Sequence, residues 1–256
     1  MTTTRQNGSL FTNIQNNIAT IEFGHPASNS FPSVLLERLT KELNEVAKND
    51  AVSVIILKSE GERAFCAGAS FDELVSISNL ESGKQFFSGF ANVINAMRTC
   101  GKLIVGRVQG KTVGGGVGLA AACDYVLATE NASIKLSEFT IGIGPFVIEP
   151  AVKRKIGLAA LSELTLDATN WKNAYWAKEK GLFAKVLETN KELDEELDVF
   201  TSKLASYNPE ALSEMKRVLW DGTSDWDVLL TDRAAISGEL VLSEFTKNAL
   251  SKFSKK

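Results

Sequence analysis

Short runs of β-branched and aliphatic residues alternate with longer amphipathic segments over the first half of the chain. The runs have the composition of buried strands, and several are followed by a glycine or proline turn. They lie at residues 18–23, 52–57, 103–108 and 125–128. Between them, residues 34–47 and 86–97 carry apolar side chains three or four positions apart, which predicts helices. The alternation predicts the α/β fold class, built from a loosely repeated unit of strand, turn and helix.

The pattern changes after Pro150, where helical spacing predominates. One strand-like run, at residues 183–187, interrupts it. The predicted helices lie at residues 159–164, 173–180, 191–205, 209–218 and 225–253. We therefore expect a core over residues 1–190 and a helical C-terminal region over residues 191–256.

Composition limits the classes of function. With 256 residues, 44% of them hydrophobic, the chain can bury a full core. Its formal net charge of -3 provides no field that attracts nucleic acid, so nucleic acid is not an expected partner. The N-terminus is polar, and the longest apolar run, from Val117 to Cys123, is too short for a membrane span, so we expect no membrane association.

Cysteine and histidine usage bears on metals and on location. The three cysteines, Cys66, Cys100 and Cys123, have no paired spacing, and His25 is the single histidine. This usage offers no framework for zinc or for disulfides. We expect no metal, and a protein of the reducing cytoplasm.

Two turns of small residues are the strongest chemical signal. The segment 108–119, VQGKTVGGGVGL, runs from an apolar strand through consecutive glycines into an alanine-rich helix. Glycine lets a ligand approach the main chain, and a helix start adds unpaired N–H donors, so an anionic oxygen is the natural ligand. A second turn, within residues 64–74, also follows a strand and opens a predicted helix. Two N–H groups that converge from these turns would form an oxyanion hole for a carbonyl becoming an enolate.

Two phosphate-binding motifs are partly matched by the glycine-rich segment. A P-loop requires glycine at position 105, where the chain has Val105, so this motif is rejected. A dinucleotide fingerprint can be traced over residues 116–121, with Glu138 as the ribose partner. Because Glu138 follows Ser137 in a loop-like segment instead of ending the next strand, the dinucleotide interpretation is the weaker alternative.

Four motifs, in this order, resemble the enoyl-CoA hydratase/isomerase, or crotonase, superfamily. They are AFCAGA at 64–69, VQG at 108–110 with GGG at 114–116, Cys123-Asp124, and LSEFTIG at 136–142. The similarity runs from about Ile14 to the C-terminus. It implies a crotonase-like spiral of ββα units with a helical C-terminal trimerisation region, in a homotrimer or a hexamer made of two trimers. It also implies an acyl-CoA thioester substrate and no separate cofactor, because coenzyme A is part of the substrate.

The resemblance assigns roles to single positions. The backbone N–H groups of Ala69 and Gly115 are the implied oxyanion-hole donors, and Glu138 is the implied catalytic carboxylate. A lone carboxylate among apolar neighbours is costly to desolvate, which favours a catalytic role for Glu138. Contacts to substrate or coenzyme A are implied at Cys66, Ala67, Gly68, Gly114, Pro145, Phe146 and Lys255.

One departure from the family pattern bears on the reaction. Typical enoyl-CoA hydratases carry a further glutamate two residues after the glycine triplet, where this chain has Gly118. A single glutamate suffices for an enoyl-CoA isomerase, which removes and returns one proton. The segments 114–119, 136–138 and 142–148 are instead similar to bacterial methylglutaconyl-CoA hydratases, so we predict a hydratase, with an isomerase or a non-catalytic acyl-CoA-binding protein as alternatives. A branched acidic acyl group would need a nearby cation, and Lys153 or Arg154 is a candidate by sequence proximity.

Overall fold

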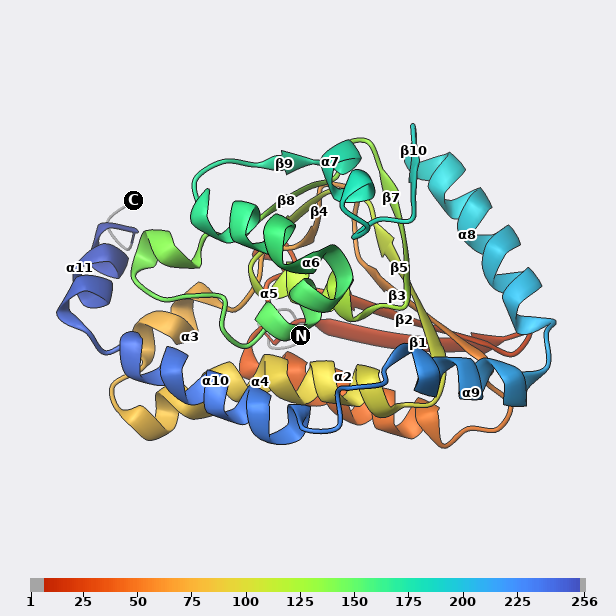
Figure 1. Ribbon diagram of the computed structural model, residues 1–256, viewed down its shortest axis with the longest axis horizontal. Coiled ribbons are helices and arrows are strands. Elements are labelled where there is room, and N and C mark those ends of the chain that lie inside the picture. Colours follow the sequence, from red (N-terminus) through yellow and green to blue (C-terminus); the bar gives the residue numbers. More distant parts are fainter. Residues whose placement is uncertain (1–6, 254–256) are drawn as a thin grey trace.

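Six strands form the larger of two sheets in the computed structural model, which describes residues 7–253 (Figure 1). In spatial order they are β1 (Ser9–Gln15), β2 (Ile18–Gly24), β3 (Val54–Ser59), β5 (Leu103–Val108), β7 (Tyr125–Thr129) and β10 (Lys185–Leu187). β1 and β2 are antiparallel, and the other neighbouring pairs are parallel. Asn16 and Asn17, both with positive φ, form the tight turn between β1 and β2, a conformation that asparagine tolerates.

Four short strands form the second sheet. In spatial order they are β4 (Ala64–Cys66), β6 (Lys111–Val113), β8 (Ser133–Lys135) and β9 (Lys172–Asn173). The chain alternates between the sheets, because β3, β5 and β7 lie in the larger sheet and the strand after each of them lies in the smaller one. A helix or helical turn then follows, so the repeated unit consists of two strands and a helix, the ββα spiral that the resemblance implies.

The helices of the core follow the small-sheet strands or connect units. They are α2 (Ser33–Ala47), α3 (Phe71–Ser76), α4 (Leu80–Thr99), α5 (Gly115–Ala122), the 3-10 turn η1 (Glu138–Ile141), α6 (Glu149–Leu166) and α7 (Ala174–Glu179). α4 begins before the predicted 86–97 because Asn79 caps it: its side chain accepts a hydrogen bond from the Ser82 N–H at 2.9 Å. In α5, the residues from Gly116 to Ala122 are all buried, which explains why this helix is apolar on every side.

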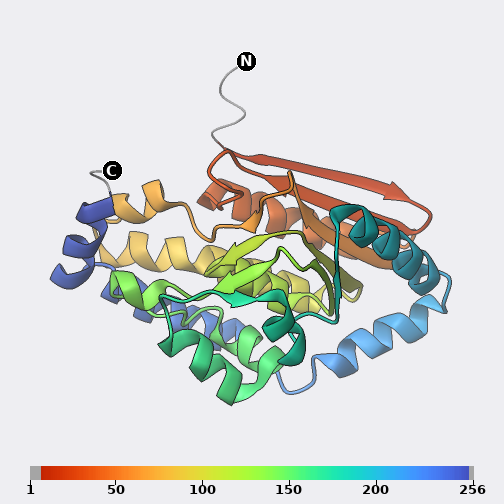
Figure 2. The ribbon, with the colours of Figure 1, turned by 90° about the horizontal axis from the view of Figure 1, so that it is seen from above.

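Four helices complete the described chain. They are α8 (Asn190–Ala205), α9 (Pro209–Leu219), α10 (Trp226–Leu240) and α11 (Glu244–Phe253). The single helix predicted over 225–253 is therefore two helices. α10 lies alongside α4, where Gly83 and Gly238 allow the backbones to approach, and α11 lies at the opposite end of the molecule from α8 (Figures 1 and 2). None of the helices within residues 7–253 is long and apolar enough to cross a membrane.

Candidate active site

The junction of β6 and α5 presents a backbone donor at a glycine that packs closely against an aromatic ring. Gly114, with φ of 53°, donates its N–H to the Lys135 carbonyl at 3.0 Å, and Gly115 then starts α5. Within the described chain the Gly115 N–H has no hydrogen-bond partner, as expected of the first residue of a helix. A Cβ at Gly115 would lie 2.8 Å from Cε2 of Phe90, and other ring atoms would be closer still. The absence of a side chain at Gly115 thus allows the Phe90 ring to pack beside the unpaired Gly115 N–H.

The turn after β4 presents a second free donor. Phe31 donates its N–H to the Gly68 carbonyl at 2.8 Å and accepts from the Ser70 N–H at 2.9 Å. In this parallel bridge the intervening Ala69 N–H points away from Phe31, and no atom of the described residues accepts from it. A Cβ at Gly68 would lie 3.5 Å from the Gly115 nitrogen, so the two turns are in contact. Both predicted donors therefore border the same space.

Glu138, the first residue of η1, places its carboxylate beside Gly114. A Cβ at Gly114 would lie 2.9 Å from Oε1 of Glu138. Oε2 is buried and has no hydrogen-bond partner within the described chain. Burial raises the pKa of Glu138 to about 7, and its own backbone N–H opposes the shift only in part. A carboxyl group with this pKa can both accept and release a proton near neutral pH.

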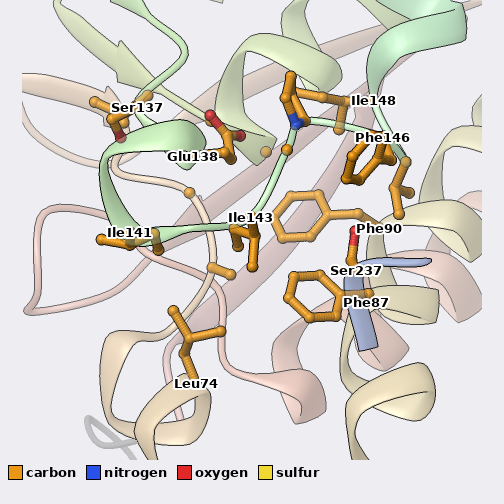
Figure 3. A pocket seen from close by; sticks show the side chains of 18 of the residues that line it. Leu74, Phe87, Phe90, Ser137, Glu138, Ile141, Ile143, Phe146, Ile148 and Ser237 are labelled. Carbon is orange, nitrogen blue, oxygen red and sulfur yellow. The ribbon is translucent and has the colours of Figure 1, made fainter. Parts of the chain in front are cut away.

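The two donors and the carboxylate line one cavity of about 390 Å³. Most of its wall is apolar, and Figure 3 shows the rings of Phe87 and Phe90 near Ile143, with the carboxylate of Glu138 at the edge. Five of the lining side chains are almost fully buried: Phe86, Phe90, Ile143, Ile148 and Ser237. Among the described residues, the charged residues in the lining are Glu138 and Lys135.

Most of the predicted site residues meet at this cavity. Its lining includes Ala67, Gly68, Ala69, Gly114, Gly115, Glu138, Pro145 and Phe146. Cys66 is not part of the lining: it is buried in β4, its Sγ accepts from the Gly68 N–H at 3.3 Å, and burial raises the pKa of its thiol to about 12. Lys255 lies outside the described residues.

Lys153 and Arg154, the candidate cations for an acidic acyl group, do not line the cavity of Glu138. Lys153 and Arg154 border a second cavity, together with Asp124 and Arg233, and not the cavity of Glu138. The basic residue in the lining is Lys135, which no motif of the sequence marks. Its position three residues before Glu138 in β8 was the available signal.

Two further residues of the cavity wall come from distant segments. Ser237 belongs to α10, and Phe87 belongs to α4, on which α10 lies. The place of Ser237 in this wall depends on the packing of α10 against α4 through Gly83 and Gly238, which no local pattern encodes.

Comparisons with known proteins agree with this geometry. The family model described as enoyl-CoA hydratase/isomerase matches residues 13–249. The chain is 28% identical over 242 residues to short-chain-enoyl-CoA hydratase of Clostridium acetobutylicum, covering 93% of this chain and 92% of the relative. It is 29% identical over 194 residues to a peroxisomal Delta(3,5)-Delta(2,4)-dienoyl-CoA isomerase of Arabidopsis thaliana, covering 70% and 68%.

A further relative and a solved structure complete the comparison. Mitochondrial methylglutaconyl-CoA hydratase of Rattus norvegicus is 34% identical over 167 residues, which are 65% of this chain and 52% of the relative. The crystal structure of enoyl-CoA hydratase from Bacillus halodurans superposes with a TM-score of 0.88 at 20% identity, covering 95% of this chain and 99% of that one. This similarity confirms the predicted crotonase-like α/β fold.

Proposed function

The chain belongs to the enoyl-CoA hydratase/isomerase family, and from this premise we propose that it is an enoyl-CoA hydratase. It would add water across the conjugated double bond of a 2-enoyl-CoA thioester. The observation that carries the proposal is the Glu138 carboxylate, which is buried and unpartnered at Oε2, lies beside Gly114 and lines the same cavity as the two free N–H groups. A base next to two donors is the arrangement that enolate chemistry needs.

The proposed reaction uses the backbone and one side chain. The N–H groups of Ala69 and Gly115 bind the thioester oxygen and stabilise the negative charge that develops on it. Glu138 removes a proton from water as the water oxygen bonds to C3, and the electrons of the double bond move into the enolate. Glu138 then gives the proton to C2, which restores the carboxylate. One carboxyl group with a pKa of about 7 serves both steps.

The cavity wall supports a neutral, apolar acyl group. The buried part of the lining consists of aromatic and aliphatic side chains with the hydroxyl of Ser237, and a carboxylate bound against these side chains would lack a cationic partner. The motif similarity to methylglutaconyl-CoA hydratases makes the branched acidic ester the natural competitor in a substrate comparison. We propose that the neutral branched or linear ester is the better substrate.

A second candidate, an enoyl-CoA isomerase, is favoured by one observation. The position that carries a further glutamate in typical hydratases is Gly118, and the side chain of Ile148 lies directly against it. Isomerisation of a 3-enoyl ester needs one base, which removes a proton from C2 and returns it to C4. Glu138 alone meets that requirement.

Ultraviolet absorbance of the conjugated thioester tests the proposal. The purified protein is mixed separately with 2-enoyl-CoA and 3-enoyl-CoA esters, each with neutral and acidic acyl groups, beside Glu138→Gln and the control Glu149→Gln. Glu149 borders the second cavity and is a carboxylate outside the proposed site. Loss of conjugation from the 2-enoyl ester in wild type and control, but not in Glu138→Gln, is the expected result.

The other outcomes distinguish the alternatives. Gain of conjugation from the 3-enoyl ester alone would identify an isomerase. Binding of CoA esters without any absorbance change would identify a non-catalytic acyl-CoA-binding protein, and saturable binding of NAD would support the dinucleotide interpretation.

A further inference from the structure

We propose that the acyl group of the substrate carries an aromatic ring on C3, which binds against a wall of phenylalanine rings from α4 and Phe146. The inference rests on the proposed acyl-CoA substrate and names the class of acyl group within it. An aryl group is neutral, as the proposed preference for neutral esters requires, and among neutral esters the aryl ester is the one that binds most tightly.

Phenylalanine is the most frequent residue in the described lining of the cavity. The five that line it are Phe71, Phe86, Phe87, Phe90 and Phe146. Three of them come from one short stretch of α4, where residues three and four positions apart lie on the same side of the helix. Leucine or isoleucine would cover an aliphatic chain equally well. The concentration of rings therefore indicates an aromatic ligand, because ring pairs contribute beyond the apolar area that they bury.

Other rings hold the α4 phenylalanines in fixed orientations. The ring centres of Phe90 and Phe31 lie 6.0 Å apart, with an angle of 71° between the ring planes. Phe31 is fully buried. The ring centres of Phe86 and Phe87 lie 5.1 Å apart, with their planes at 88°. Both pairs have the edge-to-face arrangement that aromatic rings prefer. A rigid aryl group can bind against such a wall with little loss of conformational freedom, whereas a linear chain loses more.

The aromatic wall begins at the proposed thioester site. The Phe90 ring packs where a side chain at Gly115 would lie, so it is next to the N–H that would bind the thioester oxygen. C3 is two bonds from the thioester carbon, and a ring on C3 therefore reaches this wall. Phe86 and Phe90 are only 7% and 5% exposed. The polar arm of coenzyme A is costly to remove from water, so these buried rings suit the acyl group.

Phe87 and Phe146 are the positions at which the wall can be altered. Both side chains are only partly buried, in contrast to Phe90 and Phe31. Figure 3 shows their rings on the same side of the pocket as the ring of Phe90. Leucine at either position removes a ring and keeps the wall apolar. The two residues are therefore specificity-determining positions in this proposal.

Isothermal titration calorimetry with three saturated CoA thioesters tests the proposal without any requirement for turnover. The acyl groups are 3-phenylpropanoyl, 3-cyclohexylpropanoyl and nonanoyl, which have the same number of carbons and no double bond to hydrate. We expect wild type to bind the phenyl ester about threefold to tenfold more tightly than either of the others. Cyclohexyl is the more apolar ring, so a wall that recognised only apolar area would bind it at least as tightly.

The same titrations on variants assign the preference to the rings. Phe87→Leu and Phe146→Leu should each reduce the preference for phenyl over cyclohexyl, and the double variant should bring it below about twofold. The matched control is Phe11→Leu, which removes a ring from β1 that is 66% exposed and outside the cavity lining. This control should keep the wild-type preference. Equal unfolding temperatures would show that the variants are folded.

The outcomes separate this inference from the proposed function. Binding of the cyclohexyl or nonanoyl ester by wild type as tightly as the phenyl ester would overturn the aromatic subsite, and so would absence of binding of all three. An undiminished preference in the double variant, or its loss in Phe11→Leu, would overturn it as well. If wild type prefers the phenyl ester but hydrates no 2-enoyl ester, the proposed reaction fails and the subsite stands. Hydration without any preference for the phenyl ester would have the opposite meaning.

Discussion

Ile148 occupies the space that a side chain at Gly118 would need. A Cβ built at Gly118 would lie 2.7 Å from Cβ of Ile148 and closer still to its Cγ2. Both residues are buried, Gly118 in α5 and Ile148 just before α6. A glutamate at position 118 is therefore incompatible with Ile148 in its present place. The same contact thus explains why position 118 has no carboxylate and why Ile148 can form part of the apolar cavity wall.

The first prediction concerns this contact. Gly118→Ala should lower the free energy of unfolding by about 1–3 kcal/mol, because the new methyl group overlaps a packed side chain. Ile148→Ala should lower it by about 2–4 kcal/mol through the space it leaves. In the double variant the new methyl group enters that space, so the loss should be smaller than the sum. Denaturant unfolding of the four proteins measures this coupling, and strictly additive losses would contradict it.

The second prediction isolates the Gly115 donor. Gly115→Ala and Gly115→Pro both introduce a Cβ against Phe90, but only proline removes the N–H. Position 115 is the first residue of α5, where proline is compatible with a helix. We expect the proline variant to turn over substrate on the order of a hundredfold more slowly than the alanine variant. Equal rates for the two variants, measured with the same enoyl ester, would show that the N–H is not used.

The third prediction follows from the raised pKa of Glu138. As a base the carboxylate must be ionised, so kcat/KM should rise with pH through an apparent pKa of about 7 and then level off. A profile that is flat from about pH 6 to about pH 8, on the order of one unit to either side of that value, would contradict this assignment.

The same shift has a consequence for stability. The folded pKa of about 7 lies above the ordinary value of 4.5, so between these values the native state binds more protons than the unfolded state. Stability is fully present below the lower value and falls as pH rises through the higher one. Glu138→Gln removes this titration and should be more stable than wild type above that window, by at most about 3 kcal/mol. Unfolding curves across pH should converge in acid, and a constant difference would refute the linkage.

The backbone parts of the site could be predicted because their signal is local. The glycines at 114–116 and the small residues at 64–69 leave the main chain accessible to a ligand, which the sequence alone indicates. Both turns line the cavity. The strand β1 was missed because Phe11 and Ile14 are exposed, so its pattern does not resemble that of a buried strand.

The parts that were missed depend on packing between distant segments. Ser237 reaches the cavity only because α10 lies on α4, and Lys135 contacts Trp171 only because β9 pairs with β8. The break between α10 and α11 reflects capping and not hydrophobic spacing: the Thr246 N–H donates to Ser243 Oγ at 3.2 Å, which starts a new helix. Hydrophobic periodicity alone does not predict the break between α10 and α11.

A buried ion pair holds α9 to the large sheet. Asp124 accepts hydrogen bonds from Lys216 Nζ at 2.7 Å, from the Ile104 N–H at 2.7 Å and from Trp220 Nε1 at 2.8 Å. The side chains of Lys216 and Asp124 are only 2% and 5% exposed. Ile104 belongs to β5, so one carboxylate connects the sheet to the end of α9. Asp124, which belongs to the Cys123-Asp124 motif, thus joins segments that lie far apart in the sequence.

The last prediction tests that connection. Asp124→Asn should lower the free energy of unfolding by about 3–5 kcal/mol, because it leaves the ammonium of Lys216 buried without a countercharge. Adding Lys216→Met should recover part of this loss, since the unpaired charge is then gone. The matched control is Lys191→Gln, which breaks an exposed pair with Glu195 and should change stability by less than about 1 kcal/mol. If Asp124→Asn proved as mild as this control, the pair would contribute little, and the attachment of α9 would have to rest on the apolar contacts of Leu212 with the sheet.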